Sequence, residues 1–171
     1  MRKEKELAHA TVCFLNKENK ILLAIKSRHI GEGCWNGYGG GIDPGEKPRE
    51  AAVRELKEET GGVITLPDQL EKIAEIDFHN TKSDGGIFVC KVHFYLVKQW
   101  QGEVQETEEM LKPTWFDIKK LPLDEMMPAD KKWLSIALSG KKVKAQPKLG
   151  PFQKKLLEDF EIEEVDSFDE D

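Results

Sequence analysis

Residues 40–61 read GGIDPGEKPREAAVRELKEETG, a glycine-rich turn followed by a charged helical pattern. The helix is predicted to run from Lys47 to Thr60, because Pro48 suits its first turn and Gly61 suits its C-terminal end. Small and apolar residues on one side of this segment, the alanines among them, permit close approach to a sheet. The stretch therefore predicts a helix that packs on a sheet and keeps its charged residues on the other side.

The charged side of this helix carries Glu55, Glu58 and Glu59. Residues three and four apart share one face of a helix, so the three carboxylates project into one small volume. A hard divalent cation would relieve their mutual repulsion. Two interpretations are open at this point: a magnesium site that serves to cut a pyrophosphate, or a charged helix face in solvent.

The spacing of the whole stretch favours the metal site. From Gly40 it follows the pattern Gly-x5-Glu-x7-Arg-Glu-apolar-x-Glu-Glu-x-Gly, which resembles the signature of the Nudix hydrolases. Gly62 departs from that signature, because an apolar residue is usual there. The resemblance implies an α/β fold, namely an α/β/α sandwich with a mixed sheet and the signature helix. It also implies hydrolysis that depends on magnesium, with manganese as an alternative ion.

The resemblance implies roles for individual residues as well. In the family a glycine carbonyl joins the glutamates around the metal, so the predicted metal ligands are Gly40, Glu55, Glu58, Glu59 and Glu109. Glu109 would approach from a distant loop, and plain solvated charge is the alternative for it. Glu55 and Glu59 are also the candidate general bases. Arg54 completes the predicted catalytic set, either by orienting a glutamate through a charge-assisted hydrogen bond or merely as a surface pair.

Three segments outside the signature bear on the substrate: Trp35-Asn36-Gly37-Tyr38, Trp115-Phe116 and Pro128-x-Asp130-x-x-Trp133. They resemble the oxidised purine nucleoside triphosphatase branch of the family, which includes 8-oxo-dGTP diphosphatases. The resemblance implies that asparagine and aspartate side chains read the edge of the base while an aromatic ring stacks on it. The predicted substrate-binding residues are Lys26, Trp35, Asn36, Phe78, Met127 and Asp130. Ile30 is a further candidate wall, and both Ile30 and Phe78 suit an ordinary core equally well.

Two positions depart from that branch. Its members have Trp-Pro-Asp-Asp where this chain has Met127-Pro128-Ala129-Asp130. A flexible thioether therefore replaces a stacking indole, and a methyl group replaces a carboxylate that reads the base. Methionine can still cover the face of a ring, but the hydrogen bonds to the base must differ.

Bulk properties suit one domain of an intracellular enzyme. With 171 residues, 39% of them hydrophobic, the chain is predicted to form a single domain over residues 1–165, followed by an acidic tail at 166–171. No long apolar run follows the charged residues Met1–Glu6, so we expect neither a signal peptide nor a membrane span. Three cysteines without metal-type spacing are expected to be ordinary reduced residues. We therefore expect a cytoplasmic protein, with a monomer favoured.

Charge is distributed unevenly within the net charge of −6. Residues 158–171 contain nine acids and no Lys or Arg, whereas residues 131–157 contain eight lysines and no acid. The lysine-rich segment is either a surface that attracts phosphate or simply a solvated helix and loop. Because the chain is acidic overall and has no nucleic-acid-binding signature, no DNA or RNA partner is expected.

Periodicity predicts the remaining elements. Apolar and β-branched runs predict strands at Ala8–Leu15 and Lys20–Ile25, joined as a hairpin by residues 16–19. Further strands are predicted at residues 71–78, 88–97 and 114–117, with a last one within 160–165, and a second helix near residues 129–138. Helices are expected on both faces of the sheet.

The predicted function is magnesium-dependent hydrolysis of a nucleoside triphosphate to monophosphate and pyrophosphate, with an oxidised purine nucleotide as substrate. This reaction would cleanse the nucleotide pool and so serve DNA repair. Two alternatives remain open: a Nudix pyrophosphatase for another nucleoside diphosphate derivative, and a non-catalytic module that senses a nucleotide. The marker residues of ADP-ribose and dinucleoside polyphosphate hydrolases are absent near Asp77–His79, and every signature glutamate is retained.

Overall fold

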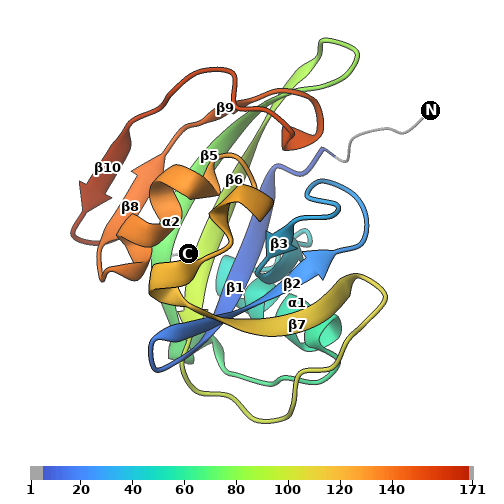
Figure 1. Cartoon of the computed structure of the whole chain (residues 1–171), viewed down its shortest axis with the longest axis vertical. Coiled ribbons are helices and arrows are strands. Elements are labelled where there is room, and N and C mark those ends of the chain that lie inside the picture. The colour runs from blue at the N-terminus through green and yellow to red at the C-terminus, as the bar shows by residue number, and fades with distance from the viewer. Residues whose placement is uncertain (1–5, 170–171) are drawn as a thin grey trace.

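The computed structural model describes residues 6–169, so Met1–Lys5 and the last two acids of the predicted tail, Glu170 and Asp171, lie outside the described residues. Within this range ten strands form one sheet, and Figure 1 shows helix α2 in front of it and helix α1 behind it. The strands are β1 (His9–Lys17), β2 (Lys20–Lys26), β3 (Trp35–Asn36), β4 (Tyr38–Gly41), β5 (Leu70–Thr81), β6 (Ile87–Val97), β7 (Met110–Asp117), β8 (Lys142–Ala145), β9 (Lys148–Leu149) and β10 (Ile162–Val165). The α-helices are α1 (Pro48–Thr60) and α2 (Asp130–Leu138), and the 3-10 helices are η1 (Pro67–Gln69), η2 (Ile118–Lys120), η3 (Leu123–Glu125) and η4 (Pro151–Gln153). None of the helices within residues 6–169 is both long and apolar enough to cross a membrane.

The sheet is mixed. Its main order is β10-β8-β5-β6-β1-β2-β3, with β4 beside β1, β7 beside β2 and β9 beside β5. β1 runs parallel to β6 and β5 runs parallel to β8, whereas β5 and β6 form a long antiparallel pair. With the parallel pair β5 and β9, three parallel pairings lie inside a largely antiparallel sheet and confirm the predicted mixed sheet.

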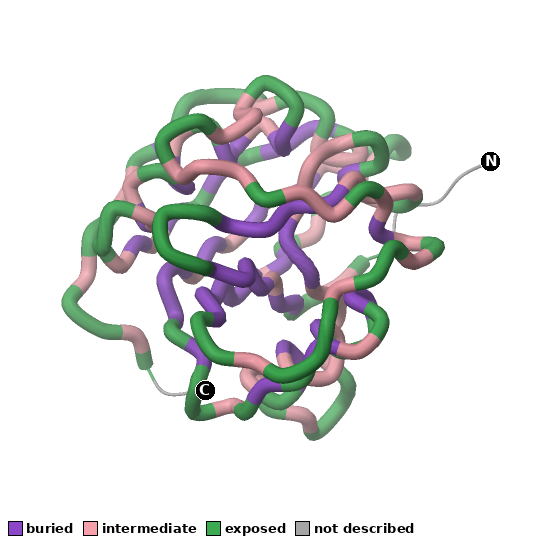
Figure 2. Tube along the Cα trace, turned by 60° about the horizontal axis from the view of Figure 1, so that its bottom comes forward, coloured by how far each residue is buried: buried purple, intermediate pink, exposed green. Residues whose placement is uncertain are grey.

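Strand alternation divides the core into two layers. Phe14 and Leu23 belong to the layer under α2, which contributes Trp133. Their neighbours along the strands, such as Cys13, belong to the layer under α1, which contributes Leu56. Side chains alternate between the faces of a strand, so each central strand serves both layers. The predicted α/β/α sandwich is therefore confirmed, and Figure 2 shows the buried backbone at the centre with the exposed backbone in the outer loops.

The sheet divides beside β1, and this division creates the site. β1 pairs with β2 at its C-terminal end, where Asn16 faces Ile21, but along Ala10–Cys13 its antiparallel neighbour is β4. β2 instead carries β3 and β7 on its own edges. The half-sheet β3-β2-β7 consequently diverges from the larger half, and side chains from both halves line the space between them.

The structure corrects several predicted boundaries. The hairpin turn is Glu18-Asn19 rather than residues 16–19, because β1 continues to Lys17. β7 begins at Met110, well before the predicted residue 114, and strands β8 and β9 were not predicted. The glycine-rich run before α1 is partly a strand, β4, instead of a loop. There, the absence of a side chain serves close approach: a Cβ on Gly39 would lie 1.7 Å from the Thr11 carbonyl oxygen of β1.

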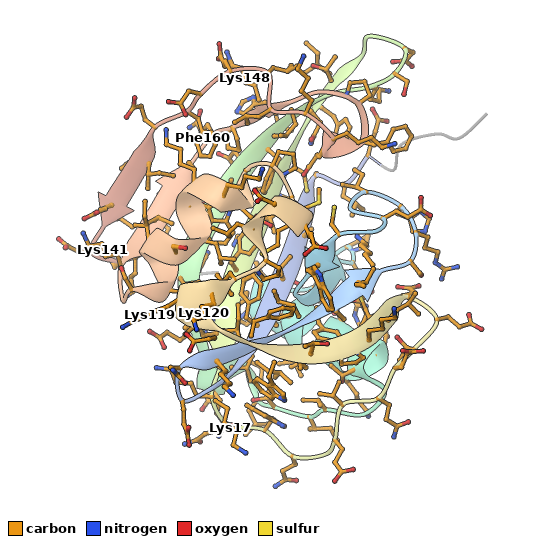
Figure 3. All side chains as sticks on the ribbon, viewed as in Figure 1. Lys17, Lys119, Lys120, Lys141, Lys148 and Phe160 are labelled. Carbon is orange, nitrogen blue, oxygen red and sulfur yellow. The ribbon has the colours of Figure 1, made fainter. Side chains whose placement is uncertain are left out.

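Three of the eight lysines in residues 131–157 form ion pairs with the acidic segment that follows. Lys132 lies 2.7 Å from Asp159, Lys141 lies 3.0 Å from Glu164, and Lys148 lies 3.0 Å from Glu158. In Figure 3 Lys141 and Lys148 lie along the outer edge near β8, β9 and β10, with Phe160 between them in this view. These lysines hold the acidic segment against the body. The two interpretations of the lysine-rich segment, a surface that attracts phosphate and a solvated helix and loop, stay predictions.

Candidate active site

Arg54 connects the glycine-rich turn to helix α1. Its guanidinium donates to both oxygens of Glu46, each at 2.9 Å, and to the carbonyl oxygen of Gly41 at 3.0 Å. A further N–H donates to Glu55 Oε1 at 2.8 Å. Planar, charge-assisted contacts of this kind fix geometry as well as charge, and they hold the pKa of the Glu46 carboxyl below its usual value. Arg54 therefore orients Glu55. This favours the interpretation of Arg54 as a residue that orients a glutamate over that of a mere surface pair.

Glu55 lies directly against the glycine segment. A Cβ added to Gly40 would come 2.6 Å from the Glu55 carboxyl carbon, so a side chain at this position would displace the carboxylate. Burial is the main cause of the raised pKa of Glu55, and repulsion from Glu58 and Glu109 adds to it, while Arg54 acts in the opposite direction. Because Gly40 has no side chain, the half-buried Glu55 carboxylate can lie close to the backbone of the glycine segment.

Glu59 is the most buried carboxylate of the cluster, with 8% of its surface exposed. It accepts a hydrogen bond from the Gly39 backbone N–H at 2.8 Å. Burial raises its pKa to about 8, a hydrogen bond shared with Glu109 contributes, and the Gly39 N–H and the Lys26 charge oppose the shift. The hydrogen bond between the two carboxyl groups raises the pKa of Glu59 and lowers that of Glu109.

The loop that carries Glu109 reaches the cluster, as the sequence predicts. Thr107 Oγ1 donates to the Glu59 carbonyl oxygen at 3.0 Å and so fixes this loop to the end of α1. Arg28 donates to Glu109 Oε1 at 2.5 Å, and this hydrogen bond is the main reason why the pKa of Glu109 is lowered. Together these elements enclose a cavity of about 520 Å³, lined by all five predicted metal ligands. We call it the acidic cavity.

The donor set of the acidic cavity fits a hard divalent cation. Carboxylate oxygens and one backbone carbonyl are the ligands that Mg²⁺ takes, usually with water completing the shell. Within residues 6–169 the acidic side chains do not converge into a closed ligand set in this arrangement. Glu58 is 60% exposed, while Arg54 holds Glu55 and Arg28 holds Glu109. The mutual repulsion that raises the pKa of Glu55 is the feature that a bound cation would relieve.

A second cavity, of about 170 Å³, opens beside the first between the two halves of the sheet. Its walls are mostly apolar and include Phe78, Ile30 and Met127, while Asn36, Asp130 and Lys26 are among its polar members. The two cavities share lining residues, namely Leu7, Lys26, Ile30, Gly39, Gly40 and Glu59. We call the second one the base cavity. One ligand can therefore place an anionic group at the carboxylates and a flat apolar group between the half-sheets.

Asp130 is a buried acid at the first position of α2. Its carboxylate accepts a hydrogen bond from Trp133 Nε1 at 3.1 Å. Burial raises its pKa to about 7, against the hydrogen bonds from Trp133 and from the Met127 backbone. A carboxyl group with this pKa is present in both forms near neutral pH, so it can either donate or accept a hydrogen bond.

The family model described as the NUDIX domain matches residues 5–135, which is more than half of the chain. The chain belongs to the Nudix family. An oxidized purine nucleoside triphosphate hydrolase from Danio rerio is 36% identical over 132 residues, covering 77% of this chain and 80% of that protein. Its counterpart from Mus musculus is 33% identical over 158 residues, covering 92% and 96%. The fold is also that of the MutT protein of Bacillus halodurans, with a TM-score of 0.74 at 23% identity over 91% of this chain and 97% of that one.

Within this Nudix site, one predicted substrate contact is placed elsewhere. Trp35 and Asn36 are neighbours in β3, so their side chains point to opposite faces of the strand. Asn36 lines the base cavity, with its Nδ2 donating to the Cys34 carbonyl oxygen at 3.1 Å. The Trp35 ring packs edge-on against Phe116, with centroids 4.9 Å apart, and is not among the lining residues. Trp35 therefore packs against Phe116 on the other face of β3 from Asn36, and its contact with a ligand stays a prediction.

Several residues of the Nudix site were not found from the sequence. Glu46 was recognised only as a signature position, although its spacing from Arg54 could have identified the pair. Thr11, Asn80 and Gln153 all line the base cavity. Among the described residues, the Thr11 hydroxyl is one of the buried polar groups without a hydrogen-bond partner. No local pattern marks these three residues, because they meet only in the folded chain.

Proposed function

We propose that this Nudix protein is a magnesium-dependent pyrophosphohydrolase that converts an oxidised purine nucleoside triphosphate into the monophosphate and pyrophosphate. The continuity of the two cavities carries the proposal. Glu59 and the Gly39-Gly40 backbone belong to both, so a base held between the half-sheets would place its phosphates beside the carboxylates. The similarity to the oxidized purine nucleoside triphosphate hydrolases of Danio rerio and Mus musculus supports the same substrate class.

In this proposal the Gly40 carbonyl and the carboxylates of Glu55, Glu58, Glu59 and Glu109 hold the magnesium ion. When bound, the ion shields the phosphates and lowers the pKa of the attacking water. Glu55 or Glu59 takes the proton from that water. Arg54 acts on Glu55, which it holds at 2.8 Å against the glycine segment, and so fixes the direction of one carboxylate.

The base cavity provides the selectivity. Asn36 and Asp130 offer amide and carboxyl groups to the edge of a purine, and the pKa of Asp130, about 7, lets it donate as well as accept near neutral pH. Phe78, Ile30 and Met127 belong to the apolar walls against which a purine ring would pack. Lys26 lies where the two cavities meet and is placed to attract the phosphates.

The cellular role proposed here is removal of oxidised nucleotides from the pool before a polymerase uses them, in the service of DNA repair. The protein would act in the cytoplasm as a monomer, on a small-molecule substrate, without binding nucleic acid or membranes. Residues 1–165 would form the catalytic domain, and 166–171 the acidic tail. Residue Phe168 of this tail lies with its ring 5.0 Å from Lys72 Nζ, so the tail contacts the domain.

A substrate panel tests the proposal. The purified protein is assayed with magnesium against 8-oxo-dGTP, 2-oxo-dATP, dGTP, dATP, ADP-ribose and a dinucleoside polyphosphate, and kcat/KM is compared. We expect an oxidised purine triphosphate to give the highest value. If ADP-ribose or the dinucleoside polyphosphate were the best substrate, the triphosphate assignment would fail. If no compound were cleaved while nucleotides bound, the protein would be a sensing module.

A further inference from the structure

Two polar side chains in the base cavity lie outside the signature and outside the predicted base-reading pair. Asn80 is near the end of β5 and is 2% exposed, and Gln153 ends the short helix η4. Gln153 Nε2 donates to Asn80 Oδ1 at 2.9 Å, and Asn80 Nδ2 donates to the Phe78 carbonyl oxygen at 3.0 Å. Residues far apart in the sequence thus form a hydrogen-bonded pair in the wall of the cavity.

The loop that carries Gln153 keeps an unfavourable backbone conformation. Phe152 and Gln153 have φ values of 56° and 55°, in the left-handed region that few non-glycine residues adopt. The loop is closed by Gln153 N–H donating to the Gly150 carbonyl oxygen at 3.0 Å and by Gly150 N–H donating to the Lys155 carbonyl oxygen at 2.9 Å. Such conformations persist where the surrounding structure enforces them, and they cluster at ligand-binding positions. Here the enforced backbone directs one amide into the cavity.

The Gln153 amide keeps a donor and an acceptor for a ligand. Within residues 6–169, its bond to Asn80 is the one hydrogen bond found for this side chain. That bond uses one of the two N–H groups, so a second N–H and the carbonyl oxygen of the same amide stay available. A planar amide of this kind pairs with a base edge that presents an adjacent acceptor and donor, as glutamine does with adenine.

Oxidation at C8 creates such an edge on guanine. In dGTP both N7 and O6 are hydrogen-bond acceptors. In 8-oxo-dGTP, N7 carries a hydrogen and C8 carries a carbonyl, so a donor and an acceptor lie side by side. The Gln153 carbonyl can accept from N7–H while its free N–H donates to O8. In dGTP, N7 carries no hydrogen and is an acceptor. The Gln153 carbonyl oxygen that would face it is also an acceptor, so the two cannot form a hydrogen bond.

We propose that Gln153, held in place by Asn80, is a specificity-determining residue that reads the imidazole edge of an oxidised purine. Asn36 and Asp130 would read the opposite, pyrimidine edge. The inference rests on the proposed function and deepens it, because it explains how a chain with Met127 and Ala129 still distinguishes an oxidised base.

The test compares kcat/KM for 8-oxo-dGTP with kcat/KM for dGTP in the full-length protein. Gln153→Ala removes the amide, and Gln153→Asn shortens it while keeping a residue that tolerates positive φ. Gln146→Ala is the matched control, because Gln146 is an exposed glutamine of the same C-terminal segment. We expect both Gln153 variants to lower the 8-oxo-dGTP to dGTP ratio by about fivefold or more, since one lost hydrogen bond has about a fivefold effect and the proposal involves two. The control is expected to leave the ratio unchanged.

Asn80 is a positioning residue in this proposal, so its effect should depend on Gln153. Asn80→Ala should lower the same ratio, and the double variant Asn80→Ala/Gln153→Ala should fall no further than Gln153→Ala alone. Additive losses would mean that Asn80 acts independently, against the proposal. A wild-type enzyme that prefers 8-oxo-dGTP, with a ratio unchanged in both Gln153 variants, would overturn this inference and leave the proposed function standing. Equal losses for both nucleotides would also overturn it. A wild-type protein that cleaves neither nucleotide would overturn both.

Discussion

Asp130→Asn should stabilise the protein in a manner that depends on pH. Burial raises the pKa of Asp130 from 3.8 to about 7, so the folded state retains a proton that the unfolded chain releases. Between these two values the folded state binds more protons than the unfolded state, and the free energy of unfolding therefore falls as pH rises. Below pH 3.8 this group imposes no penalty, and above pH 7 the penalty is constant. Asparagine preserves the shape and the acceptor for Trp133, but it carries no charge.

The size of the effect follows from the shift. Each pKa unit corresponds to about 1.4 kcal/mol, so the full shift sets an upper limit of about 4 kcal/mol at pH 8. About 2.6 kcal/mol of this develops between pH 5 and pH 8. The stabilisation of Asp130→Asn over wild type should therefore grow by about 2.6 kcal/mol across this range.

Urea unfolding at pH 5, 6, 7 and 8 measures the difference directly. Asp124→Asn serves as the control, because the Asp124 side chain is 98% exposed in the preceding turn. A control curve that parallels wild type would exclude an effect of net charge. A difference between Asp130→Asn and wild type that stays constant from pH 5 to pH 8 would refute the reasoning, since it would mean that Asp130 is ionised in the folded protein throughout.

The other predictions concern activity. Glu59→Gln should lower kcat by two or more orders of magnitude at saturating magnesium, since a ligand or base is lost. Thermal melts without metal should show unchanged or higher stability. Near wild-type turnover would mean that Glu59 is not part of the site. Arg54→Ala should lower kcat about tenfold or more, because Glu55 loses its orienting partner, and equal activity in steady-state assays would contradict that role. Met127→Trp/Ala129→Asp should raise the preference for 8-oxo-dGTP over dGTP about fivefold, as one restored hydrogen bond allows, and an unchanged preference would show that these two positions do not contact the base.

The parts of the site that lie close in sequence were predictable. The α1 boundaries agree with the prediction to within one residue, because Pro48 and Gly61 mark the two ends and Gly61 adopts a φ of 78°. The meeting of Glu55, Glu58 and Glu59 follows from helical periodicity, and no long-range information is needed for it. The approach of Glu109 was predicted from resemblance to the family and not from its local sequence.

The parts of the site that depend on tertiary contacts were not predictable. Strand β4 consists mostly of glycine, which has a low preference for strands, and only its pairing with β1 makes it one. The positions of Asn80 and Gln153 depend on β9 pairing beside β5, which no local pattern indicates. Trp35 and Asn36 lie on opposite faces of β3, because side chains alternate along a strand.

The most direct test of the proposed function is the identity of the products from 8-oxo-dGTP, followed by phosphorus NMR with magnesium present. The proposal predicts 8-oxo-dGMP and pyrophosphate, formed by wild type, suppressed by EDTA and restored by added magnesium. Formation of orthophosphate and 8-oxo-dGDP would contradict it. Formation of 8-oxo-dGMP and pyrophosphate at an undiminished rate in EDTA would contradict it as well.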